Sequence, residues 1–144
     1  MARPLPEPVL FLDECLGSSD VPVALRAKGI RVELLHDHFD LATPDTTWLA
    51  EVGKRNWVVL TKDQRIRRRR VEIDALLAAN IAAFVLTSGN LTGAQTAIAF
   101  VMAWPRIQKA VRDYALPIVA AVDAKGSIRF LTETVRHAAA KRER

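Results

Sequence analysis

Apolar and polar positions along the chain predict strands that alternate with helices. Largely apolar runs of five or six residues indicate strands at 8–13, 30–35, 57–61, 82–87 and 118–122. Helical spacing, with cap and stop residues in place, occupies the intervals at 20–28, 44–53, 71–79 and about 92–114. Short apolar strands joined through helices are typical of parallel sheets that are covered on both faces. The pattern therefore predicts an α/β fold, a three-layer sandwich with a mainly parallel central sheet of about five strands.

The end of the chain departs from this alternation. After the run at 118–122, residues 123–126 carry a turn signal and "SIRFLT" has the composition of a strand, which predicts a C-terminal hairpin. No internal repeat, low-complexity linker or shift in composition marks a second domain. We therefore expect a single domain over 1–132 and a basic tail over 133–144 that forms a frayed helix.

Composition narrows the class of protein. The chain has 144 residues, of which 50% are hydrophobic, and this is enough for one well-formed core. Its apolar runs are too short to cross a bilayer, and the first meets Asp13 and Glu14 too soon for a secretory signal. A single cysteine, Cys15, excludes an internal disulfide and fits a reducing compartment. A cytoplasmic protein without a membrane segment is expected.

Positive charge is concentrated in two blocks. The net charge is +5, and the basic residues cluster between 54 and 70 and again at 141–144. A basic surface favours polyanions such as nucleic acid, whereas a dense run of like charges is also typical of plain solvated surface. Charge alone leaves both interpretations open.

Acidic residues follow the predicted strands at one edge of the sheet. Asp13 ends the first strand, Asp63 follows the third, and Asp45 opens the helix between the second and third strands. The carboxyl ends of parallel strands meet at one edge, where ligands of such folds bind near the point at which the strand order reverses. The three carboxylates, distant in sequence, are therefore predicted to converge. Their candidate neighbours are Glu14, Asp37 and Asp40.

This predicted cluster has a chemical consequence. Converging carboxylates repel one another and lose hydration, so protons, basic side chains or a metal must compensate them. Hard oxygen ligands suit Mg²⁺ or Mn²⁺, which can orient a water and stabilise the leaving oxygen of a phosphodiester. Asp45 and Asp63 also have structural explanations, as a partner of the helix dipole and as a cap. Their joint placement with Asp13 favours a metal site, with Glu14 as a further ligand.

The basic block between 54 and 70 surrounds the acid at position 63. Cations beside a metal–carboxylate centre would neutralise a nucleic acid backbone while the metal acts on one linkage. Lys62 and Arg65 stand nearest to the acid. The remaining predicted phosphate contacts are Arg67, Arg68, Arg69 and Arg70.

Two further features have weaker functional readings. His36 and His38 could ligate a transition metal, but no cysteine or third nearby histidine supports such a site. Trp48, Trp57 and Trp104 could stack on bases, although core packing is the more common use of tryptophan at the first two positions.

The segments "VLFLDE" (9–14) and "PDTTWLAEVGKRNWVVLTKD" (44–63), with the basic stretch after them, resemble the PIN and PIN-like nucleases, and most of all the compact relatives of VapC-type toxins. That family begins with a strand ending in an acid, then carries an acid opening a helix and a strand ending in T-x-D. Asp13, Asp45, Thr61 and Asp63 match these positions. The resemblance implies a Mg²⁺- or Mn²⁺-dependent endoribonuclease, often held inactive by a cognate antitoxin.

The sequence also departs from the family pattern. Many PIN domains have another acid, usually Glu, between the first strand and the central helix, and here Glu14, Glu33, Asp37 and Asp40 compete for that position. The stretch from Glu72 onward is longer than the usual pattern after T-x-D. Fewer metal ligands would mean weak metal binding, a single ion or lost catalysis.

Other functions fit parts of the pattern. A phosphoacceptor receiver domain would use Asp13, Glu14 and Asp63, with Thr87 and Lys125 as its accessory residues. Lys125 follows a turn residue instead of ending a strand, and Asp45 would have no role there. A catalytically inactive binding module is a third reading.

The apolar helix near 92–104 could serve a homodimer or an antitoxin interface, with burial in the core as the simpler alternative.

Overall fold

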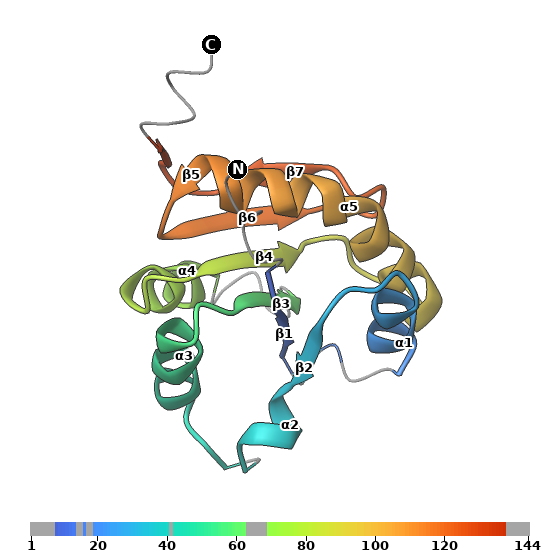
Figure 1. The fold of residues 1–144 in the computed structure, drawn as a ribbon, viewed down its shortest axis with the longest axis horizontal. Coiled ribbons are helices and arrows are strands. Elements are labelled where there is room, and N and C mark those ends of the chain that lie inside the picture. The colour runs from blue at the N-terminus through green and yellow to red at the C-terminus, as the bar shows by residue number, and fades with distance from the viewer. Residues whose placement is uncertain (1–7, 14–15, 17–18, 41, 63–68, 138–144) are drawn as a thin grey trace, which may run out of the picture.

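A computed structural model describes residues 8–13, 16, 19–40, 42–62 and 69–137, while the side chains of 45 and 69–72 lie outside the description. Strands and helices alternate along most of this chain (Figure 1). The strands are β1 (Leu10–Leu12), β2 (Val32–Leu34), β3 (Val58–Lys62), β4 (Ala82–Leu86), β5 (Tyr114–Ala115), β6 (Ile118–Val122), β7 (Ile128–Phe130) and β8 (Val135–Arg136). The helices are α1 (Asp20–Ala27), α2 (Leu35–His38), α3 (Asp45–Lys54), α4 (Arg69–Ala78) and α5 (Gly93–Asp113).

The central sheet has six strands in the order β2-β1-β3-β4-β6-β7. Neighbouring strands from β2 to β6 are parallel, and β7 is antiparallel to β6. The predicted mainly parallel sheet and the predicted hairpin are therefore both confirmed. The strand order reverses between β1 and β3, because the chain adds β2 on one side of β1 and all later strands on the other. Such a switch point is where α/β sheets bind ligands, beyond the carboxyl ends of the strands.

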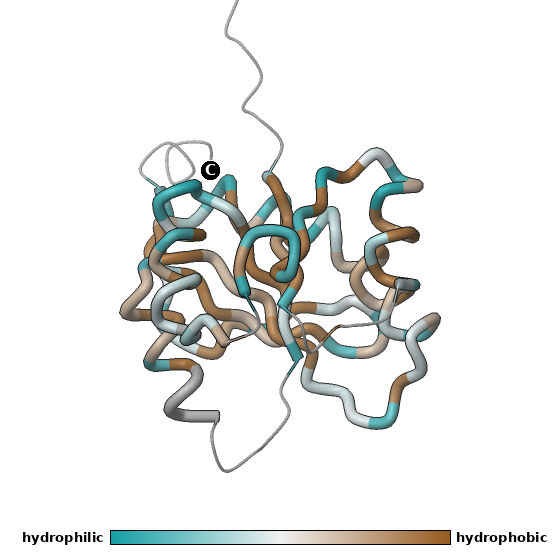
Figure 2. Tube along the Cα trace, turned by 90° about the horizontal axis from the view of Figure 1, so that it is seen from below, coloured by the Kyte–Doolittle hydropathy of each residue, from teal (hydrophilic) through white to brown (hydrophobic). Residues whose placement is uncertain are grey.

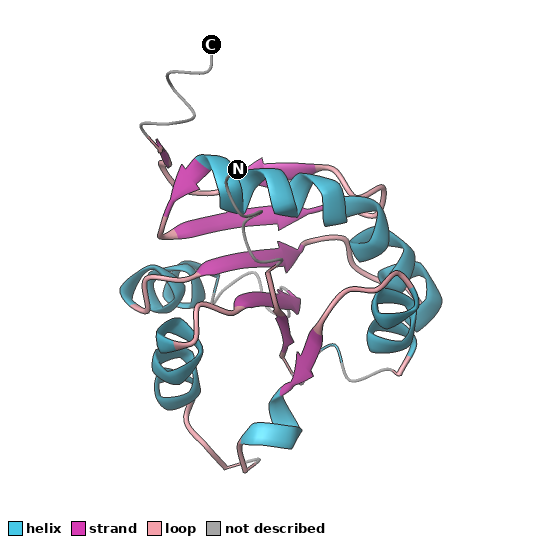
Figure 3. Ribbon diagram, viewed as in Figure 1, coloured by secondary structure: helices cyan, strands magenta, loops and turns pink. Residues whose placement is uncertain are grey.

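Helices cover both faces of the sheet and create two cores (Figure 3). Alternate residues of each strand point to opposite faces. In β1, Leu10 and Leu12 pack with α1 and α5, whereas Phe11 packs with α3 and α4. Figure 2 shows hydrophobic residues along the central strands and hydrophilic residues at the surrounding loops. Burial on both faces explains why the strands are almost wholly apolar in sequence.

The longest helix, α5, has a well-defined start. The Thr92 hydroxyl accepts the Gln95 backbone N–H at 3.1 Å, and the Gln95 side chain accepts the Thr92 N–H at 2.8 Å, a complete capping box. Pro105 lies inside the helix instead of ending it. Ala97, Phe100, Ala103 and Ile107 are buried against the sheet, so most of the apolar surface of this helix belongs to the core.

Two local predictions are wrong. No helix was predicted between the strand at 30–35 and the helix at 44–53, yet Leu35–His38 form α2. The tail over 133–144 was expected to be a frayed helix. In its described part, 133–137, Val135–Arg136 instead form β8, which pairs antiparallel with β5, and 138–144 lie outside the described residues. Within the described residues, no helix combines the length and the apolar character needed to cross a membrane.

Candidate active site at the carboxyl edge of the sheet

The ends of β1 and β3 are joined by a pair of side chains. Thr61 Oγ1 donates a hydrogen bond to Asp13 Oδ2 at 2.8 Å, and the backbone N–H of Asp13 donates to the carbonyl oxygen of Leu60 at 3.0 Å. Both residues are half-buried. A hydrogen bond to a carboxylate typically contributes about 1.5–3 kcal/mol, so this contact fixes the acid as well as stabilising it. The contact lies at the switch point of the sheet.

The bond uses one oxygen of the carboxylate. Oδ2 of Asp13 accepts from Thr61, and among the described residues Oδ1 has no hydrogen bond and neither oxygen forms an ion pair. Phe11 and Val59 face the α3 side of the sheet, and strand alternation places Thr61 on that same face. An oriented, half-buried carboxylate with a remaining lone-pair oxygen is a suitable ligand for a hard cation.

Two helices begin at this same edge. A link of three residues joins the end of α3 to β3, so the end of α3 lies at the amino edge of the sheet. The helix has 10 residues and a length of about 15 Å, which places its first residue, Asp45, toward the carboxyl edge. The same reasoning applies to α4, which ends just before β4 and begins at Arg69 and Arg70. The side chains of these three residues lie outside the described part.

The remaining predicted site residues divide into two groups. Lys62 is the last residue of β3, is half-buried and is paired in register with Leu86 of β4. Five others fall outside the described residues: Glu14, Asp63, Arg65, Arg67 and Arg68. The structure thus brings Asp13, Thr61 and Lys62 to one edge and starts α3 and α4 there.

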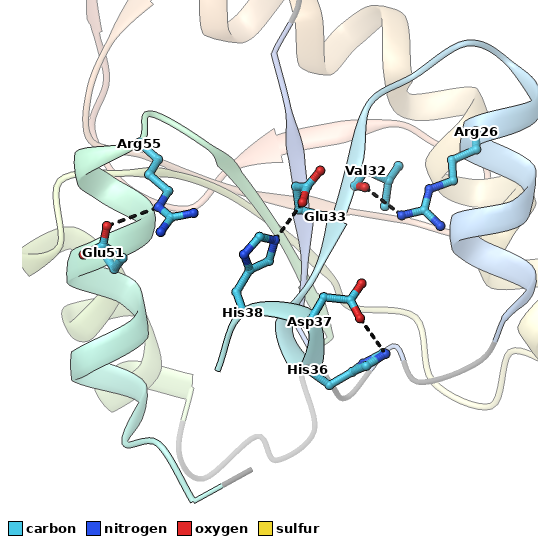
Figure 4. Close-up of polar contacts among 8 residues, drawn as sticks. All are labelled: Arg26, Val32, Glu33, His36, Asp37, His38, Glu51 and Arg55. Carbon is cyan, nitrogen blue, oxygen red and sulfur yellow. Dashed lines mark hydrogen bonds and ion pairs between the residues drawn. The ribbon is translucent and has the colours of Figure 1, made fainter. Parts of the chain in front are cut away.

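Two of the acids considered as further metal ligands have other partners (Figure 4). Glu33 Oε1 lies 2.7 Å from His38 Nε2, and Asp37 Oδ1 lies 3.5 Å from His36 Nε2. The two histidines contact different acids and do not converge on a shared point. Within the described part of the chain, no group of three or more His, Cys, Asp or Glu side chains could hold a metal.

Trp48 and Trp57 belong to an aromatic cluster around Phe11. The ring of Phe11 lies 5.6 Å from each of them, and it is stacked on Trp57. The guanidinium of Arg55 lies over Trp57, 4.8 Å from the ring centroid, while His38 contacts the same ring edge-on at 5.1 Å. The two tryptophans are therefore core residues, as their sequence positions indicate, and not base-stacking platforms at the acidic edge.

The described surface also contains a cavity that sequence reasoning did not anticipate. Its volume is about 250 Å³, and its lining includes Trp57, Ile81, Val111, Tyr114 and Leu116. These residues lie at the starts of β3 and β4 and the end of α5, so the cavity opens at the amino edge. It is separate from Asp13 and Thr61 and is mainly apolar, which makes it unsuitable for phosphodiester chemistry.

Comparison with known proteins gives matches of two kinds. The family model described as "PIN like domain" matches residues 8–88, which run from β1 to just past β4 and include Asp13, Asp45 and Asp63. A Mycobacterium tuberculosis protein named "Putative ribonuclease VapC45" is 27% identical over 107 residues, covering 72% of this chain and 78% of that protein. No solved structure gives a significant match.

Proposed function

Because the chain belongs to the PIN-like domain family, we propose that it is a divalent-metal-dependent endoribonuclease and the toxin component of a toxin–antitoxin pair. The hydrogen bond between Thr61 and Asp13 carries this proposal, since it presents a carboxylate at the switch point of a parallel sheet. The name of the VapC45 relative supports the same activity.

Asp13, Asp45 and Asp63 are the proposed catalytic ligands of Mg²⁺ or Mn²⁺, with Glu14 as a further ligand. Their donor chemistry fits these ions, because hard cations prefer carboxylate oxygens. When bound, the ion activates a water and stabilises charge on the phosphodiester. The hydrogen bond from Thr61 to Oδ2 of Asp13 fixes the orientation of the carboxylate. The other oxygen, Oδ1, is thereby held in position to bind the ion.

The basic residues act on the RNA substrate. Lys62 ends the same strand as Thr61, and Arg69 and Arg70 open α4 at the same edge. Together with Arg65, Arg67 and Arg68, they are proposed to neutralise backbone phosphates and so hold the strand against the acids. These contacts are independent of base sequence, so they supply affinity and register without choosing a target.

The proposed partner is a cognate antitoxin protein, and the proposed location is the cytoplasm. A homodimer or antitoxin interface on α5 would use Ile98 and Met102, the two large apolar residues that this helix exposes, because its other large apolar side chains are buried or half-buried. The receiver alternative receives less support, since Lys125 lies in the turn after β6 and not at the end of the strand. The inactive-module alternative differs in one respect: it predicts that the chain binds RNA but does not cleave it.

Cleavage of end-labelled single-stranded RNA by the full chain tests the proposal. Products are expected with Mg²⁺ or Mn²⁺ and are expected to vanish with EDTA or in Asp13→Asn. Glu133→Gln, which removes an exposed carboxylate beyond β7, is the matched control and should cleave normally. Metal-supplemented protein that binds RNA without cutting it would favour the inactive module, and acetyl phosphate labelling of Asp63 would favour the receiver.

A further inference from the structure

A second pair of cations lies at the carboxyl edge, on the other side of β4 from the basic block. Lys125 is exposed in the turn between β6 and β7. Arg106 reaches this turn from α5, where its Nη1 donates to the carbonyl oxygen of Gly126 at 3.2 Å. Within the described residues, neither cation forms an ion pair with a carboxylate. Lys125 and Arg106 thus bring positive charge to the same turn, and positive charge that no carboxylate neutralises attracts anions.

The turn that carries these cations is held in a single conformation by its own contacts. Asp123 Oδ1 accepts the backbone N–H groups of Lys125 and Ser127, both at 2.9 Å. Gly126 has a φ of +79° and lies directly against α5, where an added Cβ would come within 2.6 Å of Met102 Cβ. The carboxylate of Asp123 thus stabilises the turn through these hydrogen bonds, and the bonds fix the position of the Lys125 backbone.

Backbone contacts connect this turn to the proposed catalytic edge. Lys62 at the end of β3 is in register with Leu86, and Leu86 is in register with Val122. Beyond the strands, Thr87 N–H donates to Val122 O and the Ala124 N–H donates to Ser88 Oγ, each at 3.1 Å. Strands lie about 4.8 Å apart, so the end of β6 is only about 10 Å along the edge from the end of β3.

We propose that Lys125 and Arg106 bind backbone phosphates of single-stranded RNA on the far side of β4 from Lys62. The inference rests on the proposed ribonuclease function and extends its binding site across the sheet edge. Along the edge, Asp13 beyond β1, Lys62 on β3 and Lys125 beyond β6 follow one another in that order. A second group of phosphate contacts about 10 Å beyond Lys62 adds affinity and fixes the direction of the RNA strand along the edge.

RNA affinity measured without catalysis tests this directly. The full chain is titrated into a fluorescent single-stranded RNA in EDTA, and Kd is followed by anisotropy over a series of KCl concentrations. Lys125→Ala is expected to weaken binding roughly three- to tenfold and to reduce the slope of log Kd against log salt by about 0.7, the value for one phosphate contact with a single strand. Lys125→Arg should restore both quantities.

The matched control is Lys28→Ala, because Lys28 is also exposed but lies at the end of α1 ahead of β2, at the amino edge. It should leave affinity and slope unchanged. In cleavage assays, Lys125→Ala should raise KM and leave kcat near the wild-type value. Arg106→Gln should weaken binding in the same direction, with thermal melting used to check that the turn remains folded.

Equal effects of Lys125→Ala and Lys28→Ala would overturn the inference, and so would a wild-type chain that does not bind RNA. A chain that binds RNA with the expected dependence on Lys125, yet never cleaves it with any divalent metal, would support the binding site while removing the proposed ribonuclease activity. The two proposals can therefore fail separately.

Discussion

The hydroxyl of Thr61 donates to the carboxylate of Asp13 at 2.8 Å, across a separation of 48 positions in the sequence. The bond connects the ends of β1 and β3, where the strand order of the sheet reverses. Asp13 thereby acquires a fixed orientation at the place where α/β folds bind their ligands. The threonine of the T-x-D motif thus has a structural task of its own, which is to position the first acid.

Thr61→Val removes this bond while keeping the shape of the side chain. We expect a loss of about 10- to 100-fold in activity or metal affinity, the usual effect of removing a group that orients a metal ligand. The stability change should be small, on the order of 1–2 kcal/mol, because Thr61 is half-buried. Single-turnover cleavage with a metal titration measures the first effect and urea unfolding the second. Thr61→Ser keeps the hydroxyl and should retain activity; equal losses in both variants would contradict a positioning role.

Asp13→Asn should abolish cleavage without unfolding the protein, and the same holds for Asp45→Asn and Asp63→Asn. The amide keeps the shape of the side chain and can still accept from Thr61, but it removes the negative charge that binds the cation. Without metal, each variant should melt at or above the wild-type temperature, because one repelling carboxylate has been neutralised. Cleavage by gel and melting in EDTA are the measurements. An active Asp63→Asn protein would refute the site assignment.

The sheet and the position of Asp13 at its carboxyl edge could be predicted because their signals are local. Each buried parallel strand is a short apolar run, and Asp13 directly follows one of them, so strand polarity alone placed it at the carboxyl edge. The Thr61 hydroxyl was found only as a motif match, since its partner lies on another strand. Nothing in the sequence near position 61 reports which carboxylate it contacts.

The segments that were predicted wrongly depend on distant contacts. Helix α2 has four residues and no amphipathic repeat, and contacts of His38 with Glu33 and with Trp57 hold it in place. The pairing of β8 with β5 involves two residues on each strand, and the N–H of His137 donates to Asp113 O beside it. Such short elements are stabilised by tertiary structure, so local periodicity does not reveal them.

The arginine block should make RNA binding strongly dependent on salt. Each phosphate contact with a single strand contributes about 0.7 to the slope of log Kd against log salt. Replacing Arg67 and Arg68 together with Gln should therefore lower the slope by about 1.4 and weaken binding to every RNA sequence alike. Anisotropy titrations in EDTA, with RNAs of different composition, measure this. An unchanged slope would remove these arginines from the binding surface and leave them as solvated charge.

Gly126 should be needed for the hairpin to dock on α5, and Gly29 provides a matched comparison. Both have positive φ, +79° and +78°, so alanine at either position should cost about 1–2 kcal/mol in backbone strain. A Cβ at Gly29 would meet nothing within 4 Å, whereas at Gly126 it would lie 2.7 Å from the backbone N of Ala103. Because helix backbone cannot move aside as a flexible side chain can, Gly126→Ala should cost a further 1–3 kcal/mol or so. Urea unfolding gives the free energy of unfolding of both variants, and the difference between Gly126→Ala and Gly29→Ala measures the cost of the contact apart from the backbone strain. Equal destabilisation would show that the turn does not depend on close approach to α5.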